Sequence, residues 1–171
     1  MLETLITSKT RLRLLVKFFV AATNKGYLNG LAQEFGESTN AIRKELNHLA
    51  NAGYLIKNKE SNKIQYLANT IHPLFSSIQK IVHQHLGLEF IAEQVMERMG
   101  DVQTISLIGD YAKGIDSGTI EIVIYGKQLN YDYLKGLSKK IENQIERRLK
   151  MTVSKNTPKE GIILYINGSI D

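Results

Sequence analysis

Residues 28–53 read LNGLAQEFGESTNAIRKELNHLANAG, and this stretch decides the fold of the N-terminal half. Its first part predicts a short helix that ends at Gly36, a residue suited to a left-handed helix stop. The apolar residues of that helix lie at helical spacing: Leu28, Leu31, Ala32 and Phe35. Ser38 can then cap a second helix that runs to about Ala52 and is closed by Gly53. A short helix, a glycine-containing turn and a second helix predict a helix-turn-helix.

The second helix of this stretch has two distinct faces. Its inward face is apolar: Ile42, Leu46 and Leu49. Its outer face carries polar and basic residues at i, i+3, i+4 and i+7: Asn40, Arg43, Lys44 and Asn47. Glu45 is expected toward the flank, which leaves the outer face nearly free of acids. Arg and Lys suit the guanine edge in the major groove, and Asn suits adenine.

The flanking sequence extends the same unit in both directions. Ser8 is expected to cap a helix that reaches about Ala22 and is broken at 24–26. On the other side, 54–59 predicts a strand, 60–62 a turn and 63–68 a return strand. The resulting hairpin is basic, through Lys57, Lys59 and Lys63, and these lysines can approach phosphates.

Residues 31–55 resemble an ArsR- or MarR-type winged helix, and the similarity covers about residues 8–70. This resemblance implies a bacterial transcriptional regulator whose recognition helix enters the major groove while the wing contacts the DNA backbone. The DNA-binding residues that we then expect are Ser38, Thr39, Asn40, Arg43, Lys44, Asn47, Lys57, Lys59 and Lys63. Winged helices also serve as pure protein-interaction modules, so that alternative stays open.

The distribution of charge favours a polyanion as partner. Residues 1–70 carry ten Lys and Arg against five Asp and Glu, whereas residues 71–171 carry twelve of each sign. The whole net charge of +5 therefore belongs to the N-terminal segment. A local basic excess of this kind is the footprint of a nucleic-acid binder. We expect double-stranded DNA as the partner.

Composition excludes several other classes of protein. The chain has no cysteine, which removes disulfides, thiolate zinc sites and cysteine catalysis. No apolar run approaches the roughly 20 residues that a transmembrane helix needs. The N-terminus lacks a basic region followed by an apolar core, so no signal peptide is expected. We therefore expect a cytoplasmic protein without membrane contact.

Residues 71–100 predict two connecting helices. Pro73 can open the first, Gly87 interrupts, and Gly100 closes the second. The apolar stripe over 74–86 is wide enough to need burial on two sides, either between the domains or against a second copy of the chain. We expect a homodimer. The histidines of this region, His72, His83 and His85, are read as ordinary interface or surface residues, and no metal or cofactor is expected.

Residues 101–171 predict a small α+β unit with a sheet on one side and a helix on the other. Strands are expected at 102–108, 120–125, 151–155 and 162–166, and a helix from about Tyr131 to Leu149. A loop is expected to follow the first strand, at Tyr111–Gly114.

The run Gly109–Gly114, followed by Glu121 on the next strand, resembles the motif of a minimal nucleotidyltransferase domain. In that family a glycine-rich turn holds the triphosphate, and three carboxylates hold magnesium. The matching positions here are Gly109, Asp110, Lys113, Gly114 and Glu121. The resemblance implies a nucleotidyltransferase-like domain over about residues 101–155.

Several departures from this motif argue against catalysis. Asp110 replaces a serine and puts a negative charge where a phosphate oxygen would lie. The first metal carboxylate falls on Thr119, and residues 152–154 of the later strand offer none. Only Glu121 remains, with Asp116 in the loop as a substitute if the register shifts. Magnesium-assisted transfer needs a metal clamp that this set cannot supply.

Together these features predict an α+β chain with three parts. They are a winged helix-turn-helix at 1–70, connecting and dimerisation helices at 71–100, and a catalytically inactive nucleotidyltransferase-like domain at 101–171. The expected function is sequence-specific transcriptional regulation, with the C-terminal domain as scaffold or as sensor of an unidentified small molecule or protein. The alternatives are an active nucleotidyltransferase that the winged helix recruits to its substrate, and a protein-interaction module without DNA binding.

Overall fold

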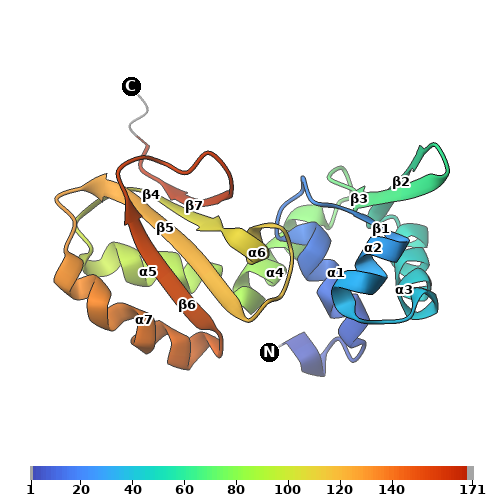
Figure 1. Cartoon of the computed structure of the whole chain (residues 1–171), viewed down its shortest axis with the longest axis horizontal. Coiled ribbons are helices and arrows are strands. Elements are labelled where there is room, and N and C mark those ends of the chain that lie inside the picture. Colours follow the sequence, from blue (N-terminus) through green and yellow to red (C-terminus); the bar gives the residue numbers. More distant parts are fainter. Residues whose placement is uncertain (1, 169–171) are drawn as a thin grey trace. The chain divides into compact units, whose positions relative to one another are not determined.

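The computed structural model describes residues 2–168, and the chain divides into two compact units, Met1–Val82 and His83–Asp171 (Figure 1). The boundary between the units falls inside the first of the two connecting helices. The segment 71–100 is therefore shared between the units. Within residues 2–168, no helix is both long enough and apolar enough to cross a membrane.

The helices of the N-terminal unit begin and end where local capping chemistry directs them. After a short 3-10 turn η1 (Leu2–Thr4), they are α1 (Lys9–Phe19), α2 (Leu28–Phe35) and α3 (Thr39–Asn51). Ser8 Oγ accepts from the Arg11 amide at 3.2 Å, and Ser38 Oγ accepts from the Ala41 amide at 3.2 Å. Gly36 ends α2 in the left-handed region, at φ 65°. These contacts confirm the predicted caps at Ser8, Ser38 and Gly36.

The sheet of this unit contains one strand that the sequence analysis did not predict. The strands β1 (Lys25–Tyr27), β2 (Leu55–Glu60) and β3 (Lys63–Ala68) are antiparallel in the order β1-β3-β2. No helix runs through 24–26, which confirms the expected break, but Lys25 and Gly26 also pair with Leu67 and Tyr66 as part of the unpredicted strand.

Helix α1 is also shorter than expected and ends at Phe19 instead of about Ala22. The Asn24 side chain folds back and donates to the Lys17 carbonyl at 3.0 Å. That carbonyl belongs to the last turn of α1 and lacks a donor further along the helix. The Asn24 side chain therefore supplies the donor that a further turn of helix would have supplied, and the chain turns toward β1.

The core of the N-terminal unit lies between its helices. Leu14, Phe18, Ile42 and Leu46 are fully buried, which confirms the predicted inward face of α3. Glu45 lies in this interior as well, at 8% exposure, so its expected place on the flank was wrong. A buried carboxylate needs charged or hydrogen-bonded partners, and its partners come from α1.

The two connecting helices are α4 (Phe75–Leu86) and α5 (Leu88–Arg98). Helix α4 begins two residues after Pro73, slightly later than expected. Gly87 separates the helices at φ 73°, and a Cβ on it would lie 2.6 Å from Ile145 Cγ2. Only glycine satisfies both the backbone conformation and this close approach.

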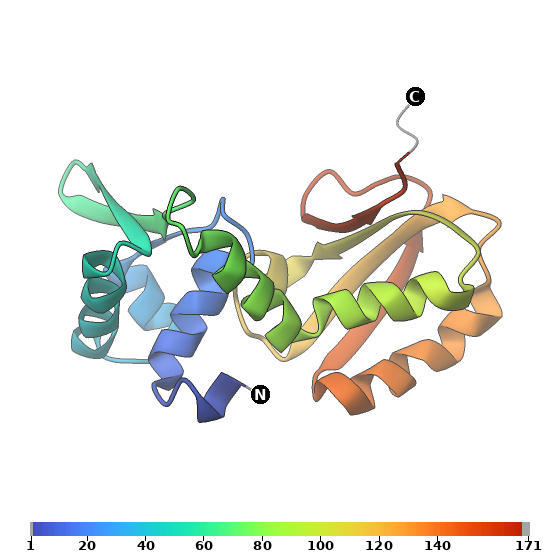
Figure 2. The same cartoon turned by 180° about the vertical axis from the view of Figure 1, so that it is seen from behind.

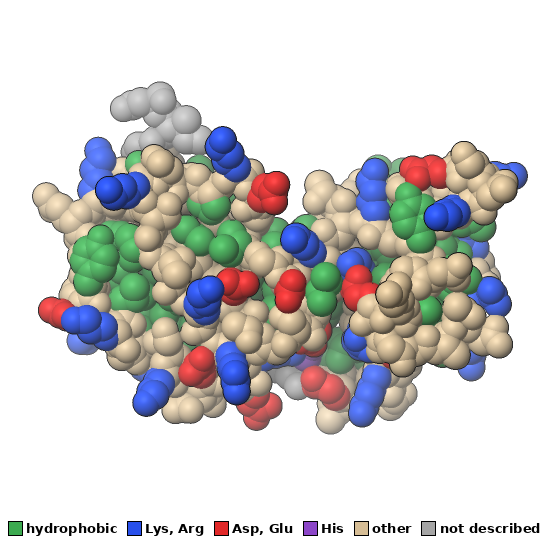
Figure 3. Space-filling model, in the orientation of Figure 1, with side chains coloured by type: hydrophobic (Ala, Val, Ile, Leu, Met, Phe, Trp, Pro, Cys, Tyr) green, Lys and Arg blue, Asp and Glu red, His purple; other side chains and the backbone are tan. Residues whose placement is uncertain are grey.

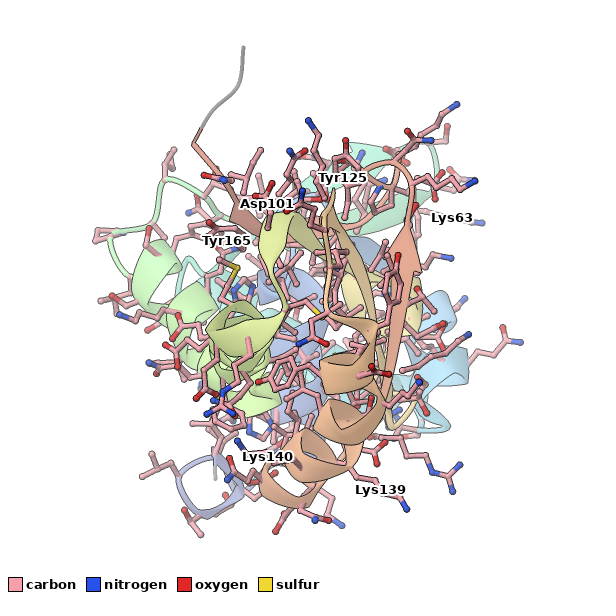
Figure 4. The ribbon with its side chains drawn as sticks, turned by 90° about the vertical axis from the view of Figure 1, so that its left-hand side faces the viewer. Lys63, Asp101, Tyr125, Lys139, Lys140 and Tyr165 are labelled. Carbon is pink, nitrogen blue, oxygen red and sulfur yellow. The ribbon has the colours of Figure 1, made fainter. Side chains whose placement is uncertain are left out.

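The C-terminal unit is a mixed sheet with helices on one face (Figure 2). Its elements are β4 (Asp101–Ile108), α6 (Gly109–Ala112), β5 (Thr119–Lys127), α7 (Tyr131–Ile145), β6 (Arg148–Ser154) and β7 (Ile162–Ile166). The strand order is β6-β5-β4-β7; β5 and β6 are parallel, and the other pairs are antiparallel. Helix α5 packs against α7, whose exposed Lys139 and Lys140 extend away from the sheet (Figure 4).

Two local expectations for this unit were wrong. Helix α7 ends at Ile145 instead of about Leu149, because Glu146 takes the left-handed conformation at φ 55°. Leu149 instead lies on β6, where it pairs with Ile120 and is 5% exposed. The chain after β4 begins with the helical turn α6, so Tyr111 is helical and not part of a loop.

Candidate nucleic-acid interface

Helix α3 presents its polar face to solvent because its apolar face is fixed in the core. Ile42 and Leu46 are fully buried, while Asn40, Arg43 and Lys44 on the opposite side are exposed. Ser38 and Thr39 at the start of the helix are also exposed, and Asn47 is half-buried. An amide, a guanidinium and an ammonium are thus available on one helical surface, without a carboxylate.

An ion pair with α1 fixes the orientation of α3. Arg11 Nε donates to Glu45 Oε2 at 2.8 Å, and Ser8 Oγ donates to Glu45 Oε1 at 2.9 Å. Burial alone would raise the pKa of Glu45, but the hydrogen bonds from Arg11 and Ser8 and the charge of Arg11 outweigh it and hold the pKa below its ordinary value. Glu45 is therefore a structural anchor of α3 and removes its negative charge from the outer face.

Strands β2 and β3 form a hairpin with a two-residue turn at 61–62. Lys57 lies opposite Tyr66 and Lys59 lies opposite Ile64. Because side chains alternate along a strand, Lys57 and Lys59 share one face of β2. Glu60 pairs with Lys63 at the end of the hairpin and accepts from the Tyr27 hydroxyl at 2.5 Å. Figure 3 shows Lys and Arg side chains on the hairpin and along the edge formed by α3.

A groove lies between α3 and this hairpin, with a volume of about 620 Å³. It is lined by Tyr27, Leu28, Asn29, Gly30, Arg43, Asn47, Lys57, Asn62, Lys63, Ile64 and Tyr66. Four of the predicted site residues meet here: Arg43, Asn47, Lys57 and Lys63. The other five, Ser38, Thr39, Asn40, Lys44 and Lys59, are exposed but do not line the groove.

Basic side chains at the groove donate hydrogen bonds to the amide side chains of α3. Lys57 Nζ donates to Asn47 Oδ1 at 3.1 Å and lies 5.8 Å from the centroid of the Tyr66 ring. Arg43 Nη1 donates to Asn40 Oδ1 at 3.0 Å. Burial raises the pKa of Tyr66, while the charge of Arg43 acts in the opposite direction. The Tyr66 side chain is therefore uncharged at neutral pH.

Sequence reasoning missed the wall of the groove that comes from β1 and α2. Tyr27 accepts from Gln65 Nε2 at 2.7 Å, and Asn29 lies near it at the start of α2. Strand β1 has three residues, too few to show an alternating pattern. The only sequence signal was the pair of Tyr27 and Asn29, an aromatic and an amide residue at the start of the helix-turn-helix.

The residues of the nucleotidyltransferase-like motif meet only in part. Gly109 takes φ 70°, and a Cβ on it would lie 2.4 Å from Glu121 Oε1. Glu121 forms an ion pair with Lys150 at 3.2 Å. Asp110 lies in the first turn of α6, Lys113 follows that turn, and Gly114 takes φ 72°. Across residues 2–168, no three His, Asp or Glu side chains are grouped to hold a metal ion.

Asp116, the only nearby substitute for a metal carboxylate, is bound to Tyr111. The fully buried Tyr111 hydroxyl donates to Asp116 Oδ1 and accepts from the Gly118 amide at 3.2 Å. Burial, and next the hydrogen bond to Asp116, raise the pKa of Tyr111 to about 12. Asp116 therefore holds the loop between α6 and β5 in place.

No protein-family model matches the chain, and no curated protein matches it in sequence. Two solved structures are similar to parts of it. One is reduced HlyU from Vibrio cholerae, with 18% identity and a TM-score of 0.39 over 48% of this chain and 82% of that chain. The other is AntR, described as an antimony-specific transcriptional repressor, with 26% identity and a TM-score of 0.41 over 54% of this chain and 78% of that chain.

Proposed function

We propose that the chain is a sequence-specific DNA-binding transcriptional regulator whose N-terminal unit binds duplex DNA. The observation that carries this proposal is the groove between α3 and the hairpin, where Arg43, Asn47, Lys57 and Lys63 meet. A recognition helix places such side chains against base edges, and a basic hairpin beside it reaches phosphates. Nothing acidic projects from the outer face of α3, since Glu45 is turned into the core.

A second copy of the chain is the proposed partner in solution. The N-terminal unit has an apolar groove of about 290 Å³ whose lining includes Leu2, Ile6, Leu15, Ile78 and Ile81. Ile81 of α4 is 45% exposed and Leu74, just before α4, is 49% exposed. A twofold arrangement would bring two recognition helices to half-sites about one DNA turn apart.

For the C-terminal unit we propose a role as scaffold or sensor, without nucleotidyl transfer. Glu121 is neutralised by Lys150, and Asp116 is engaged by Tyr111. Asp110 adds a negative charge at the turn where a triphosphate would have to lie. Like charges 4 Å apart cost on the order of 4 kcal/mol at an effective dielectric constant of about 20.

The test of this function is a selection of bound sequences from a random duplex pool, using the purified full chain. Enrichment of a related set of sites, with twofold symmetry, supports a dimeric regulator. A pool that stays random while the protein still retains duplex would show a sequence-independent binder. Failure to retain any duplex would favour a protein-interaction module.

A further inference from the structure

The two asparagines on the outer face of α3 have their side-chain oxygens already engaged within the protein. Asn47 Oδ1 accepts from Lys57 Nζ at 3.1 Å, and Asn40 Oδ1 accepts from Arg43 Nη1 at 3.0 Å. Each amide oxygen keeps a second lone pair, but a basic group already lies beside it, whereas the Nδ2 amine only donates. The positively charged donors beside these oxygens therefore favour approach of hydrogen-bond acceptors over donors at Asn40 and Asn47.

This arrangement conflicts with the usual way in which asparagine recognises adenine. That contact is bidentate: Oδ1 accepts from adenine N6, and Nδ2 donates to N7. An adenine amine brought to Asn47 Oδ1 would have to use the second lone pair of that oxygen, beside the positive charge of the Lys57 ammonium. Guanine avoids this conflict, because it presents two acceptors, O6 and N7, in the major groove.

The contacts around Lys57 hold it in this position. Its ammonium lies 5.8 Å from the ring centroid of Tyr66, which is itself 5% exposed and fixed in the sheet. Register places Lys57 directly opposite Tyr66 on β3. Through Lys57, the hairpin therefore influences whether Asn47 on the recognition helix donates or accepts hydrogen bonds.

We propose that α3 reads hydrogen-bond acceptors, so that its half-site contains guanine at the base pairs met by Arg43 and Asn47. Lys57 is a positioning residue that favours hydrogen-bond donation by Asn47 and disfavours adenine relative to guanine. This inference depends on the proposed DNA binding, and it adds which bases are read and why.

The first experiment uses the site selected by the wild-type full chain. The base pair read by Asn47 is identified as the one whose preference is lost in Asn47→Ala. We expect guanine there, and replacement of that guanine by 7-deazaguanine, which lacks the N7 acceptor, should weaken binding about tenfold or more. Adenine at that position, or no effect of 7-deazaguanine, would overturn the inference while leaving DNA binding intact.

The second experiment separates positioning from simple loss of charge. Lys57→Met frees Asn47 Oδ1, so the preference for guanine over adenine at that base pair should fall about tenfold, with the preference at the Arg43 position unchanged. The matched control is Lys63→Met, which removes one charge from the same groove. It should weaken binding equally to the duplex with guanine and to the duplex with adenine at that base pair. Lys57→Arg, which can donate to the same oxygen, should restore the preference for guanine.

Equal weakening of both duplexes by Lys57→Met, as in the control, would show that Lys57 contributes only charge and would contradict the inference. Melting temperatures of all variants, measured in parallel, identify any loss that comes from unfolding. If the wild-type chain binds no duplex in a salt-sensitive manner, the proposed function itself fails, and the inference fails with it.

Discussion

Arg11 and Glu45 join α1 to α3 by an ion pair at 2.8 Å, with the Glu45 side chain 10% exposed. We expect Glu45→Ala to lower the free energy of unfolding by about 1–3 kcal/mol, because it removes the three hydrogen bonds that Arg11 and Ser8 donate to a largely buried carboxylate. Urea denaturation followed by circular dichroism measures this change. Asp132→Ala is the matched control, because its ion pair with Lys135 is exposed on both sides and should contribute less than about 1 kcal/mol. Equal effects of the two substitutions would contradict the anchoring role.

The same carboxylate predicts a pH dependence of stability. The pKa of Glu45 is held below its ordinary value of 4.5, so its stabilisation is fully present above pH 4.5. It is lost as the pH falls through the lower pKa of the folded state. The stability difference between wild type and Glu45→Gln should therefore shrink between pH 7 and pH 3. A difference that stays constant over this range would show that ionisation of Glu45 does not contribute.

Arg43 and the hairpin lysines should affect DNA binding in different ways. Arg43→Ala should cost about 1–3 kcal/mol at the selected site and relax the preference at one base pair. Lys59→Ala or Lys63→Ala should instead weaken binding to all duplexes and reduce its salt dependence. Competition titrations with specific and scrambled duplexes distinguish the two patterns. Equal weakening of the specific and the scrambled duplex by Arg43→Ala would contradict the assignment of Arg43 to a base contact.

A dimer is expected through the apolar surface at α4. Light scattering at micromolar concentration should give twice the chain mass of 19.3 kDa. Ile81→Glu should shift this mass toward the monomer, because it places a charge on the proposed interface. Ile163→Glu is a control on β7, where the isoleucine is 52% exposed, and should leave the mass unchanged. A monomeric wild type would contradict this part of the proposal.

The C-terminal unit is expected to bind no nucleoside triphosphate tightly through magnesium. Isothermal titration with ATP, GTP, CTP and UTP in the presence of magnesium should give no micromolar binding. Incubation with α-labelled nucleotide should transfer no label to protein or RNA. Transfer that Glu121→Gln abolishes would instead make the chain a nucleotidyltransferase, with Glu121 as a metal ligand.

Sequence predicted the features that are determined within one or two turns of chain. The caps at Ser8 and Ser38 and the left-handed Gly36 follow from local hydrogen bonding and backbone conformation. The inward face of α3 follows from helical periodicity. The groups expected on the outer face of α3 were therefore assigned correctly to exposed positions, apart from the half-buried Asn47.

Features that depend on distant parts of the chain were missed. Strand β1 exists because it pairs with β3, about 40 residues later along the chain. Glu45 is buried because Arg11 reaches it from α1, 34 residues away. The engagement of Asn47 by Lys57 requires the hairpin to fold back on α3, and no pattern within α3 signals it. Such contacts join segments that are far apart in the sequence, so no local pattern could predict them.

Duplex affinity measured as a function of salt concentration tests the central claim most directly. Fluorescence anisotropy with a labelled duplex and the full chain should show log K falling linearly with log salt, with a slope of about −0.9 for each phosphate contacted. Removal of Lys63 should make that slope shallower by about one such contact. A wild-type chain with no duplex binding at low salt, or with an affinity independent of salt, would contradict DNA binding by the N-terminal unit.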